Sequence, residues 1–347
     1  MNFFRPCRNL MLLAWVLGCF APAAAGFDAA RAGFVLAAND QVLEYRNQSL
    51  FVLPGERVLL TRPPRPADRR GSSFTLDMAS GRLERRGPSC WTWRAPDEPG
   101  LVRGEVRTSE GGRMALRAFV LVPYGALADG RLDGYRIGAY PDAAGKDTLY
   151  GPPRGFVRVT AANRDTLVSP HFRLGQFLCK QTECFPQFLV LDHRLLAKLE
   201  RLLQAVNEAG IPAETLAVMS GYRTPHYNKH LGNVRFSSHC WGRAADVFID
   251  RDRNGFQDDV TGDGRADYRD VQVLHTLVDR LDRDDSQDRL RGGLGLYGAN
   301  DLHGPFVHLD VRGHRARWGK RVGPSPWLTR AARPGSPKGL RDDPPSL

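Results

Sequence analysis

The sequence predicts an α+β protein in which a small β-sandwich-like domain precedes a domain with a central antiparallel sheet and flanking helices. Short β-rich runs separated by turn residues fill residues 27–124. A leucine pattern with helical spacing begins only beyond residue 190. With 347 residues, the chain is long enough to bury two hydrophobic cores.

The N-terminal runs are rich in β-branched and aromatic residues and are separated by turns such as Pro54-Gly55. Several short strands at this spacing are typical of an immunoglobulin-like sandwich. Trp91 and Trp93 alternate with polar residues, so we expect them in the core of this domain. A sugar-stacking platform is the alternative interpretation. This half of the sequence contains no recognisable group of catalytic residue types.

Residues 125–168 form a connecting segment rich in Gly, Pro and Tyr. The segment is too aromatic for a flexible Gly/Ser linker, and we expect it to pack along one of the domains. Residues 323–347, rich in Pro, Arg and Gly, are predicted to be a flexible tail. The C-terminal domain is thereby placed at residues 169–322.

The C-terminal domain is predicted to contain two helices and three strands. Leucines at three- and four-residue spacing predict a helix from the capping residue Asp192 to Gly210, and a second helix is expected at residues 271–281. Alternation in the last strand places His308 and Asp310 on one face. The strands are expected at residues 215–219, 244–249 and 305–311.

The first 25 residues have the pattern of a secretory signal peptide. Arg5 and Arg8 precede an apolar run at residues 10–21, and small residues at 23–26 supply a cleavage site. We therefore expect export, with a periplasmic location or release from the cell after cleavage behind Ala25.

Cys19 offers a second interpretation of the same segment, because Val16 to Cys19 resembles the lipidation signal of a bacterial lipoprotein. Contact with the membrane is expected only if Cys19 is lipidated. A retained membrane anchor is the third alternative, although the apolar run is short for a membrane span.

The formal net charge of +11 suits an anionic polymer or surface as a partner. The basic residues are scattered, and no Lys/Arg run or stacking motif accompanies them. We therefore expect no nucleic-acid partner.

Four of the six cysteines follow the signal segment. Cys179 and Cys184 are close enough in sequence to form a disulfide in a short loop, which an exported protein permits. Cys90 and Cys240 are expected to be buried thiols. A zinc knuckle is disfavoured because no second Cys/His pair lies near these cysteines at the required spacing.

His239, Asp246 and His308 are the candidate metal ligands. A hydrolytic zinc site usually has three protein ligands and leaves a fourth position for water. Two neutral imidazoles and one carboxylate leave such a site with a charge of about +1, which favours the ionisation of water and the polarisation of a substrate carbonyl. Taken singly, each residue is equally compatible with a structural role in a core, turn or sheet.

Three motifs carry a family resemblance. They are Ser-Gly-Tyr-Arg-Thr-Pro at 220–225, Ser-x-His followed after six residues by Asp at 237–246, and His-x-Asp at 308–310. Together they resemble the zinc D-Ala-D-Ala carboxypeptidase family, which also includes vancomycin-resistance dipeptidases and murein endopeptidases. The resemblance extends over about residues 172–318 and includes the glycine-rich run 292–297.

The resemblance implies that His239, Asp246 and His308 are zinc ligands. It also implies that Arg223 holds the substrate or stabilises an oxyanion, for which its fixed charge and forked donors are suited. Substrate contacts are further expected from two residues beside these groups, Tyr222 and Ser238.

The proton-transfer group departs from the commoner family pattern. Many members place a glutamate three residues before the last zinc histidine, where this chain has Pro305. Others carry a histidine five residues before it, and His303 is at that position. We expect His303 to relay the proton, with a loop histidine without a chemical role as the alternative. Asp310 is expected to orient His308 or another of the metal ligands.

An acidic insertion at residues 250–270 has the alternating oxygen ligands and sharp-turn glycines of calcium loops. Calcium is therefore a second predicted cation, and a solvated acidic loop balanced by arginines is the alternative. The candidate ligands are Asp250, Asp252, Asn254, Asp259, Thr261, Asp263 and Asp270.

These observations predict an exported zinc metallopeptidase that hydrolyses stem peptides of peptidoglycan as a D,D-carboxypeptidase or endopeptidase. A non-catalytic, zinc-containing wall-binding protein anchored by the β-rich domain is the main alternative. A zinc hydrolase for a different amide is the third.

Overall fold

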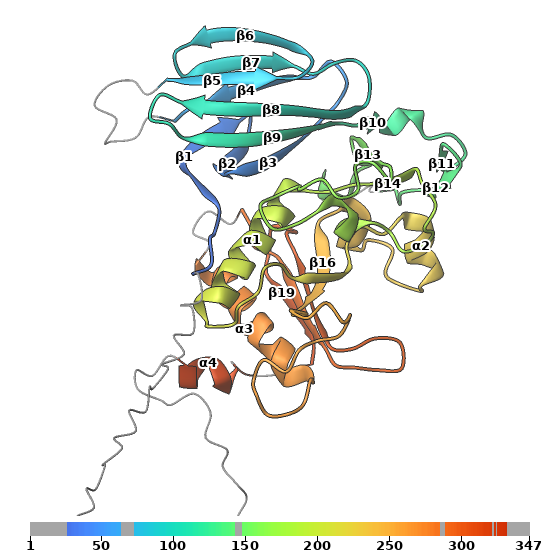
Figure 1. The fold of residues 1–347 in the computed structure, drawn as a ribbon. Helices are drawn as coiled ribbons and strands as arrows, with labels where there is room; N and C mark the ends of the chain where they lie inside the picture. The colour runs from blue at the N-terminus through green and yellow to red at the C-terminus, as the bar shows by residue number, and fades with distance from the viewer. Residues whose placement is uncertain are drawn as a thin grey trace, which may run out of the picture.

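The computed structural model describes residues 26–63, 73–142, 148–284, 289–320, 323 and 325–331. The predicted signal peptide, with Cys19, and residues 332–347 of the predicted tail lie outside the described residues. Mixed sheets and a few helices make up the fold, so the α+β class is confirmed. Figure 1 shows the β-rich N-terminal domain above the C-terminal domain.

The N-terminal domain consists of two sheets whose inner faces share one apolar core. The first has the order β2-β1-β4-β7-β6, and the second the order β3-β9-β8-β5, in which β3 is parallel to β9. The strands are β1 (Arg31–Ala38), β2 (Gln41–Tyr45), β3 (Asn47–Val52), β4 (Arg57–Thr61), β5 (Phe74–Met78), β6 (Arg82–Gly87), β7 (Cys90–Arg94), β8 (Gly100–Thr108) and β9 (Arg113–Val120).

The two tryptophans of β7 occupy the positions expected of core residues. Trp93 is fully buried and its Nε1 donates a hydrogen bond to the Ser80 carbonyl. Trp91 is partly buried, packs against the same core and donates to the Phe74 carbonyl. Their indoles therefore stabilise the sandwich.

The connecting segment contributes strands to small sheets and packs against the C-terminal domain. In it, β13 (Gly155–Val159) lies between β10 (Val122–Pro123) and β14 (Gln187–Leu189). A short hairpin pairs β11 (Arg131–Leu132) with β12 (Tyr135–Arg136). Because β14 belongs to the second half of the sequence, this sheet ties the segment to the C-terminal domain.

The C-terminal domain is built on a five-stranded sheet with the order β15-β16-β18-β17-β19. The expectation of a purely antiparallel sheet is wrong, because β17 and β19 are parallel. After β18 the chain reverses, but the neighbouring positions are already occupied by β16 and β17, so the last strand joins the far edge of β17. The strands are β15 (Ala217–Ser220), β16 (Ala244–Phe248), β17 (Gly293–Tyr297), β18 (Phe306–Asp310) and β19 (Ala316–Gly319).

Two longer helices, α1 (His193–Glu208) and α3 (Tyr268–Asp284), pack together and supply most of the helical core. The side chain of Asp192 accepts a hydrogen bond from the Arg194 amide and caps α1, as predicted. The second helix is longer than predicted at both ends. Two short helices, α2 (Pro225–His230) and α4 (Pro326–Ala331), complete the α-helices among the described residues.

A buried ion pair joins both long helices to the sheet. Lys198 Nζ of α1 donates to Asp282 Oδ1 of α3 at 2.6 Å and to the Asp310 carbonyl of β18 at 3.0 Å. The side chains of Lys198 and Asp282 are each 1 % exposed, so this pair stands in place of apolar packing. Its geometry constrains the end of β18, the strand that carries His308.

The described cysteines are all free thiols, so the expected Cys179–Cys184 disulfide is wrong for this structure. Cys179 is buried in the core, whereas Cys184 is exposed on the following loop, and the two side chains therefore face different environments. Cys240 is buried as expected, and Cys90 is half-buried.

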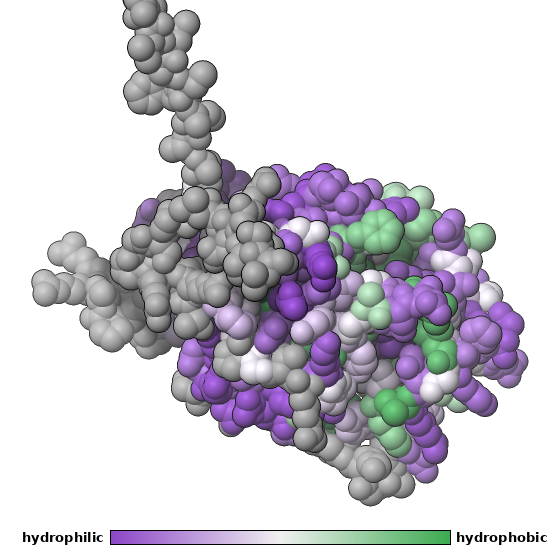
Figure 2. Space-filling model, turned by 90° about the horizontal axis from the view of Figure 1, so that it is seen from below, coloured by the Kyte–Doolittle hydropathy of each residue, from purple (hydrophilic) through white to green (hydrophobic). Residues whose placement is uncertain are grey.

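The described residues that are visible in Figure 2 are largely hydrophilic, with separate hydrophobic patches among them. Within the described ranges, every helix is too short or too polar to span a lipid bilayer.

Candidate metal centre

The pairing of the C-terminal sheet sets out one row of residues across all five strands. Asp246 of β16 is the register partner of His308 of β18. The row runs Ser220, Asp246, His308, Gly295 and Trp318. Two of the candidate ligands are thus held by backbone ladders on neighbouring strands.

His239 reaches the same place from the 3-10 helix η4 (Ser238–Trp241), which immediately precedes β16. Gly242 ends this helix with φ of 62°, a left-handed conformation, and a Cβ there would lie 2.1 Å from the Val190 carbonyl oxygen. Glycine is therefore required for the sharp turn that brings His239 back over β16.

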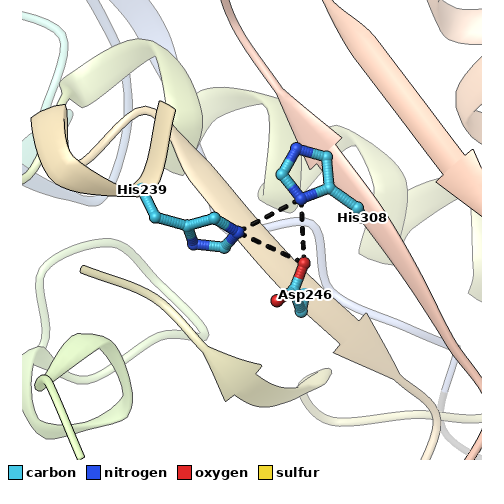
Figure 3. A group of neighbouring side chains, drawn as sticks. All are labelled: His239, Asp246 and His308. Atoms are coloured by element: carbon cyan, nitrogen blue, oxygen red, sulfur yellow. Dashed lines mark hydrogen bonds and ion pairs between the residues drawn. The ribbon is translucent and has the colours of Figure 1, made fainter. Parts of the chain in front are cut away.

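Three ligand atoms converge, as Figure 3 shows. His239 Nε2 lies 3.1 Å from His308 Nδ1 and 3.3 Å from Asp246 Oδ1. His308 Nδ1 and Asp246 Oδ1 are 2.9 Å apart. Ligand atoms about 2 Å from a tetrahedral zinc ion are about 3.3 Å from one another, so the spacing of this cluster suits zinc.

The outer nitrogen of each imidazole faces a hydrogen-bond acceptor. His239 Nδ1 lies 2.6 Å from the Gly221 carbonyl oxygen, and His308 Nε2 lies 3.4 Å from Asp310 Oδ2. These partners assign the ring proton to the outer nitrogen in both neutral histidines, which leaves both inner nitrogens with lone pairs. Two lone pairs and a carboxylate oxygen facing one another form a donor set that fits a cation.

Burial and the mutual contacts shift the pKa values of the three groups. Burial lowers the pKa of His239. Burial alone would raise the pKa of Asp246, but the charges and hydrogen bonds of His239 and His308 outweigh it and hold that pKa well below its usual range. For His308, burial acts to lower the pKa, and the hydrogen bonds with Asp246 and Asp310 raise it overall. Asp246 is therefore an anion at neutral pH, as a metal-binding carboxylate requires.

The turn after β15 supports this cluster from one side. Arg223 donates from Nε to Ser220 Oγ at 2.8 Å, and its terminal nitrogen forms an ion pair with Asp246 Oδ2. The Arg223 amide also donates to the His239 carbonyl. Arg223 thus holds the oxygen of Asp246 that faces away from the histidines, and its side chain is 14 % exposed.

Tyr222 and Ser238, which were expected to contact substrate, are buried. Tyr222 is 1 % exposed, and its hydroxyl pairs with Tyr140, which donates in turn to the Cys240 carbonyl. Ser238 is 5 % exposed and donates to Asp310 Oδ2 at 3.4 Å. Both side chains are enclosed and engaged by protein partners in this structure, and their contact with substrate stays a prediction.

His303 lies in the loop before β18 and is half-buried. Its Nδ1 donates to the Gly304 carbonyl at 2.8 Å, and its Nε2 accepts from the Asn300 amide at 3.0 Å. The ring meets Phe306 edge-on, with centroids 4.9 Å apart. Phe306 and His308 are two residues apart on one strand, so His303 borders the sheet face that carries the cluster.

The acidic insertion contains a second group of carboxylates, at Asp250, Asp252 and Asp258. Asp258 was not among the predicted ligands. Asn254 donates its amide to Asp252, which makes it a hydrogen-bond donor within the loop. Asp259 and Asp270 accept backbone N–H groups of their own loop, and the pKa of Asp270 is raised by burial. Calcium binding here remains a prediction.

Two features of the centre were not anticipated from the sequence. Trp318 borders His308, with ring centroids 5.1 Å apart. Arg312 donates to both oxygens of Asp310, at 3.0 and 2.8 Å, and holds the carboxylate that faces His308. Two features of the sequence could have pointed to these contacts. One is the strand alternation that places His308 and Asp310 on one face, and the other is the glycine-rich run before β18.

Comparison with known proteins identifies a peptidase segment. The family model for peptidase M15 matches residues 170–259, a range that contains Arg223, His239 and Asp246. This match confirms a resemblance to zinc D-Ala-D-Ala carboxypeptidases over that segment and supports a peptidase. His308 lies beyond the match, and the fold brings it to the other two candidate ligands.

Curated proteins yielded no match. Among solved structures, a crystal structure of the ZIG-8–RIG-5 IG1–IG1 heterodimer was found, at 11 % sequence identity. The alignment covers 22 % of this chain and 83 % of that chain, with a TM-score of 0.16. That score is too low to indicate a shared fold.

Proposed function

We propose that this protein is an exported zinc peptidase that hydrolyses peptide bonds in peptidoglycan stem peptides, as a D,D-carboxypeptidase or endopeptidase. The observation that carries the proposal is the convergence of His239 Nε2, Asp246 Oδ1 and His308 Nδ1, whose spacing and ring partners suit zinc. The peptidase M15 match over the segment that supplies two of these ligands supports the reaction class.

Zinc, when bound, would supply Lewis acidity that polarises an amide carbonyl and makes water nucleophilic near neutral pH. The protein residues have separate tasks. Asp246, His239 and His308 would hold the ion, the Gly221 carbonyl orients the His239 ring, and Asp310 faces the outer nitrogen of His308.

Arg223 is proposed to bind a substrate carboxylate or the developing oxyanion. Its fork is engaged by Ser220 and Asp246, so the guanidinium is already oriented at the edge of the cluster before substrate arrives. An oriented guanidinium loses little conformational freedom when it binds substrate. An arginine is therefore better suited to this role than a flexible lysine.

His303 is proposed to carry the proton from water to the leaving amine. Its neutral ring exposes Nε2 to a single donor, the Asn300 amide. If a water molecule replaced the Asn300 amide, His303 Nε2 would accept a proton from that water on the side of the sheet that carries the cluster.

Peptidoglycan is the proposed partner because the stem peptides end in the D-Ala-D-Ala bond that the related family cleaves, and because a net charge of +11 suits an anionic wall. The periplasm is the proposed location, with membrane attachment only if Cys19 is lipidated. No nucleic-acid partner is proposed.

Defined muropeptides test the bond and the reaction together. A pentapeptide monomer and a cross-linked dimer are incubated with zinc-loaded protein, and the products are identified by mass spectrometry. Loss of one D-Ala from the monomer identifies a carboxypeptidase, and cleavage of the cross-link in the dimer identifies an endopeptidase. Zinc binding with both substrates left intact would favour the non-catalytic wall-binding alternative.

A further inference from the structure

The glycine-rich strand β17 packs directly against one indole ring, that of Trp318. A Cβ at Gly295 would lie 2.5 Å from Trp318 Nε1, and a Cβ at Gly293 would lie 2.5 Å from the far edge of the same ring. No side chain fits at either position without displacing the tryptophan. Gly293 and Gly295 therefore allow the indole to lie directly on the strand beside β18.

Trp318 closes a ring of contacts around His308. Its Nε1 donates to the Tyr297 hydroxyl at 2.7 Å, and the Arg312 guanidinium carbon lies 4.9 Å from the indole centroid. Arg312 is itself bonded to Asp310, whose Oδ2 faces His308 Nε2. The indole lies 5.1 Å from the imidazole, so each member of the ring touches the next.

The imidazole of His308 needs such a restraint, because a half-turn about its Cβ–Cγ bond would turn the ring carbon Cδ2, in place of Nδ1, toward His239 and Asp246. The hydrogen bond to Asp310 is long, at 3.4 Å, and holds the ring only weakly. A rigid neighbour packed against the ring hinders its rotation by steric contact and holds the plane of the ring in place.

We propose that Trp318 is a positioning residue for metal binding, which keeps Nδ1 of His308 directed at the cation with the help of Gly293 and Gly295. The inference rests on the proposed function, because it presupposes a metal at the His239, Asp246 and His308 cluster. The proposal explains why β17 has glycine at residues 293 and 295, which strand formation alone does not require.

Zinc affinity measured by competition with a chromophoric chelator tests the proposal without reference to activity. Trp318→Ala should weaken zinc binding by about 10-fold or more, in the range found for groups that orient metal ligands. Trp318→Phe keeps a flat ring and should recover most of the affinity. Gly295→Ala displaces the indole and should weaken binding in the same direction.

The control is Trp91→Ala in the N-terminal sandwich, which also removes a partly buried indole and its N–H bond. It should leave zinc affinity unchanged. Absorption spectra of the cobalt-substituted proteins supply a second readout, since Trp318→Ala should alter the visible bands of the ion and Trp91→Ala should not.

Unchanged zinc affinity and cobalt spectra in both Trp318→Ala and Gly295→Ala would overturn the proposal while leaving the proposed function intact. If Trp318→Ala does not fold, Gly295→Ala and Trp318→Phe decide the question by the same two measurements. Failure of the unaltered protein to bind zinc would overturn both the proposed function and this inference.

Discussion

Asp246 and His308 lie directly opposite each other on neighbouring strands, and Asp246 Oδ1 is 2.9 Å from His308 Nδ1. The hydrogen bonds of the β16–β18 ladder therefore fix the spacing of two ligands, while η4 adds His239. A shift of one residue in this register would send one of the two side chains to the opposite face of the sheet. The geometry of the candidate cluster therefore depends on the register of the sheet.

Replacement of Arg223 tests the role of its forked guanidinium. Arg223→Lys keeps a positive charge but loses one of the two bonds to Ser220 and Asp246. We expect peptide hydrolysis to fall by about 100-fold, as for the loss of one oriented oxyanion donor, while zinc content stays at one per chain. Arg235→Lys, at an exposed position, is the control. Equal activity of Arg223→Lys and the unaltered protein would exclude this role.

His303→Ala tests proton transfer. If His303 relays the proton, kcat should fall by about 10² to 10⁴ and zinc affinity should not change. His314→Ala removes an exposed histidine from the loop after β18 and should leave both quantities unchanged. Full activity of zinc-loaded His303→Ala would assign the proton relay to another group.

Lys198 is predicted to make a large contribution to stability. Lys198→Met removes one partner of a pair whose side chains are 1 % exposed, and we expect a loss of about 3 kcal/mol in the free energy of unfolding measured with urea. This loss of stability is at the low end of the range found when one partner of a buried ion pair is removed. We expect a small value because Arg317 also binds Asp282, at 2.7 Å.

The matched variant combines Lys198→Met with Asp282→Leu. It removes both charges and should recover part of the lost stability, because the buried carboxylate that has lost its lysine partner is removed as well. A single variant as stable as the unaltered protein would show that the pair makes no net contribution.

Stability should depend on pH through His171, whose Nδ1 lies 2.6 Å from the buried carboxylate of Glu200. Burial acts to lower the pKa of His171, but the hydrogen bond and charge of Glu200 outweigh it and raise the pKa overall. The stabilisation is complete below the ordinary histidine pKa of 6.5 and is lost as pH rises through the raised value in the folded protein.

Urea unfolding from mildly acidic to mildly alkaline pH measures this effect. His171→Gln should be less stable than the unaltered protein at the acidic end, and the difference should shrink as pH rises. His230→Gln, at an exposed position, should show no such trend. A difference that grows with pH would contradict the assignment.

The elements that were predicted from the sequence have strong local signals. Helix α1 follows from its leucine spacing and the Asp192 cap, and β18 follows from alternation around His308. The three candidate ligands were predicted because separate motifs converge on one chemistry, and the structure brings their side chains together.

The elements that were missed depend on distant partners. Strand β17 is rich in glycine and has little strand propensity, and its glycines are explained only by Trp318, which lies more than twenty residues later in the chain. The parallel pairing of β19 follows from which sheet edges remain free. Likewise, the short spacing of Cys179 and Cys184 gave no information about the core that encloses only the first.

The most direct test of the account is peptide hydrolysis measured as a function of zinc occupancy. Protein stripped with a chelator is titrated with zinc, and cleavage of a muropeptide is followed by mass spectrometry beside His308→Ala. We predict that cleavage rises in proportion to bound zinc up to one ion per chain, and that His308→Ala neither retains zinc nor cleaves. Cleavage by the stripped protein, or none at full occupancy, would contradict the account.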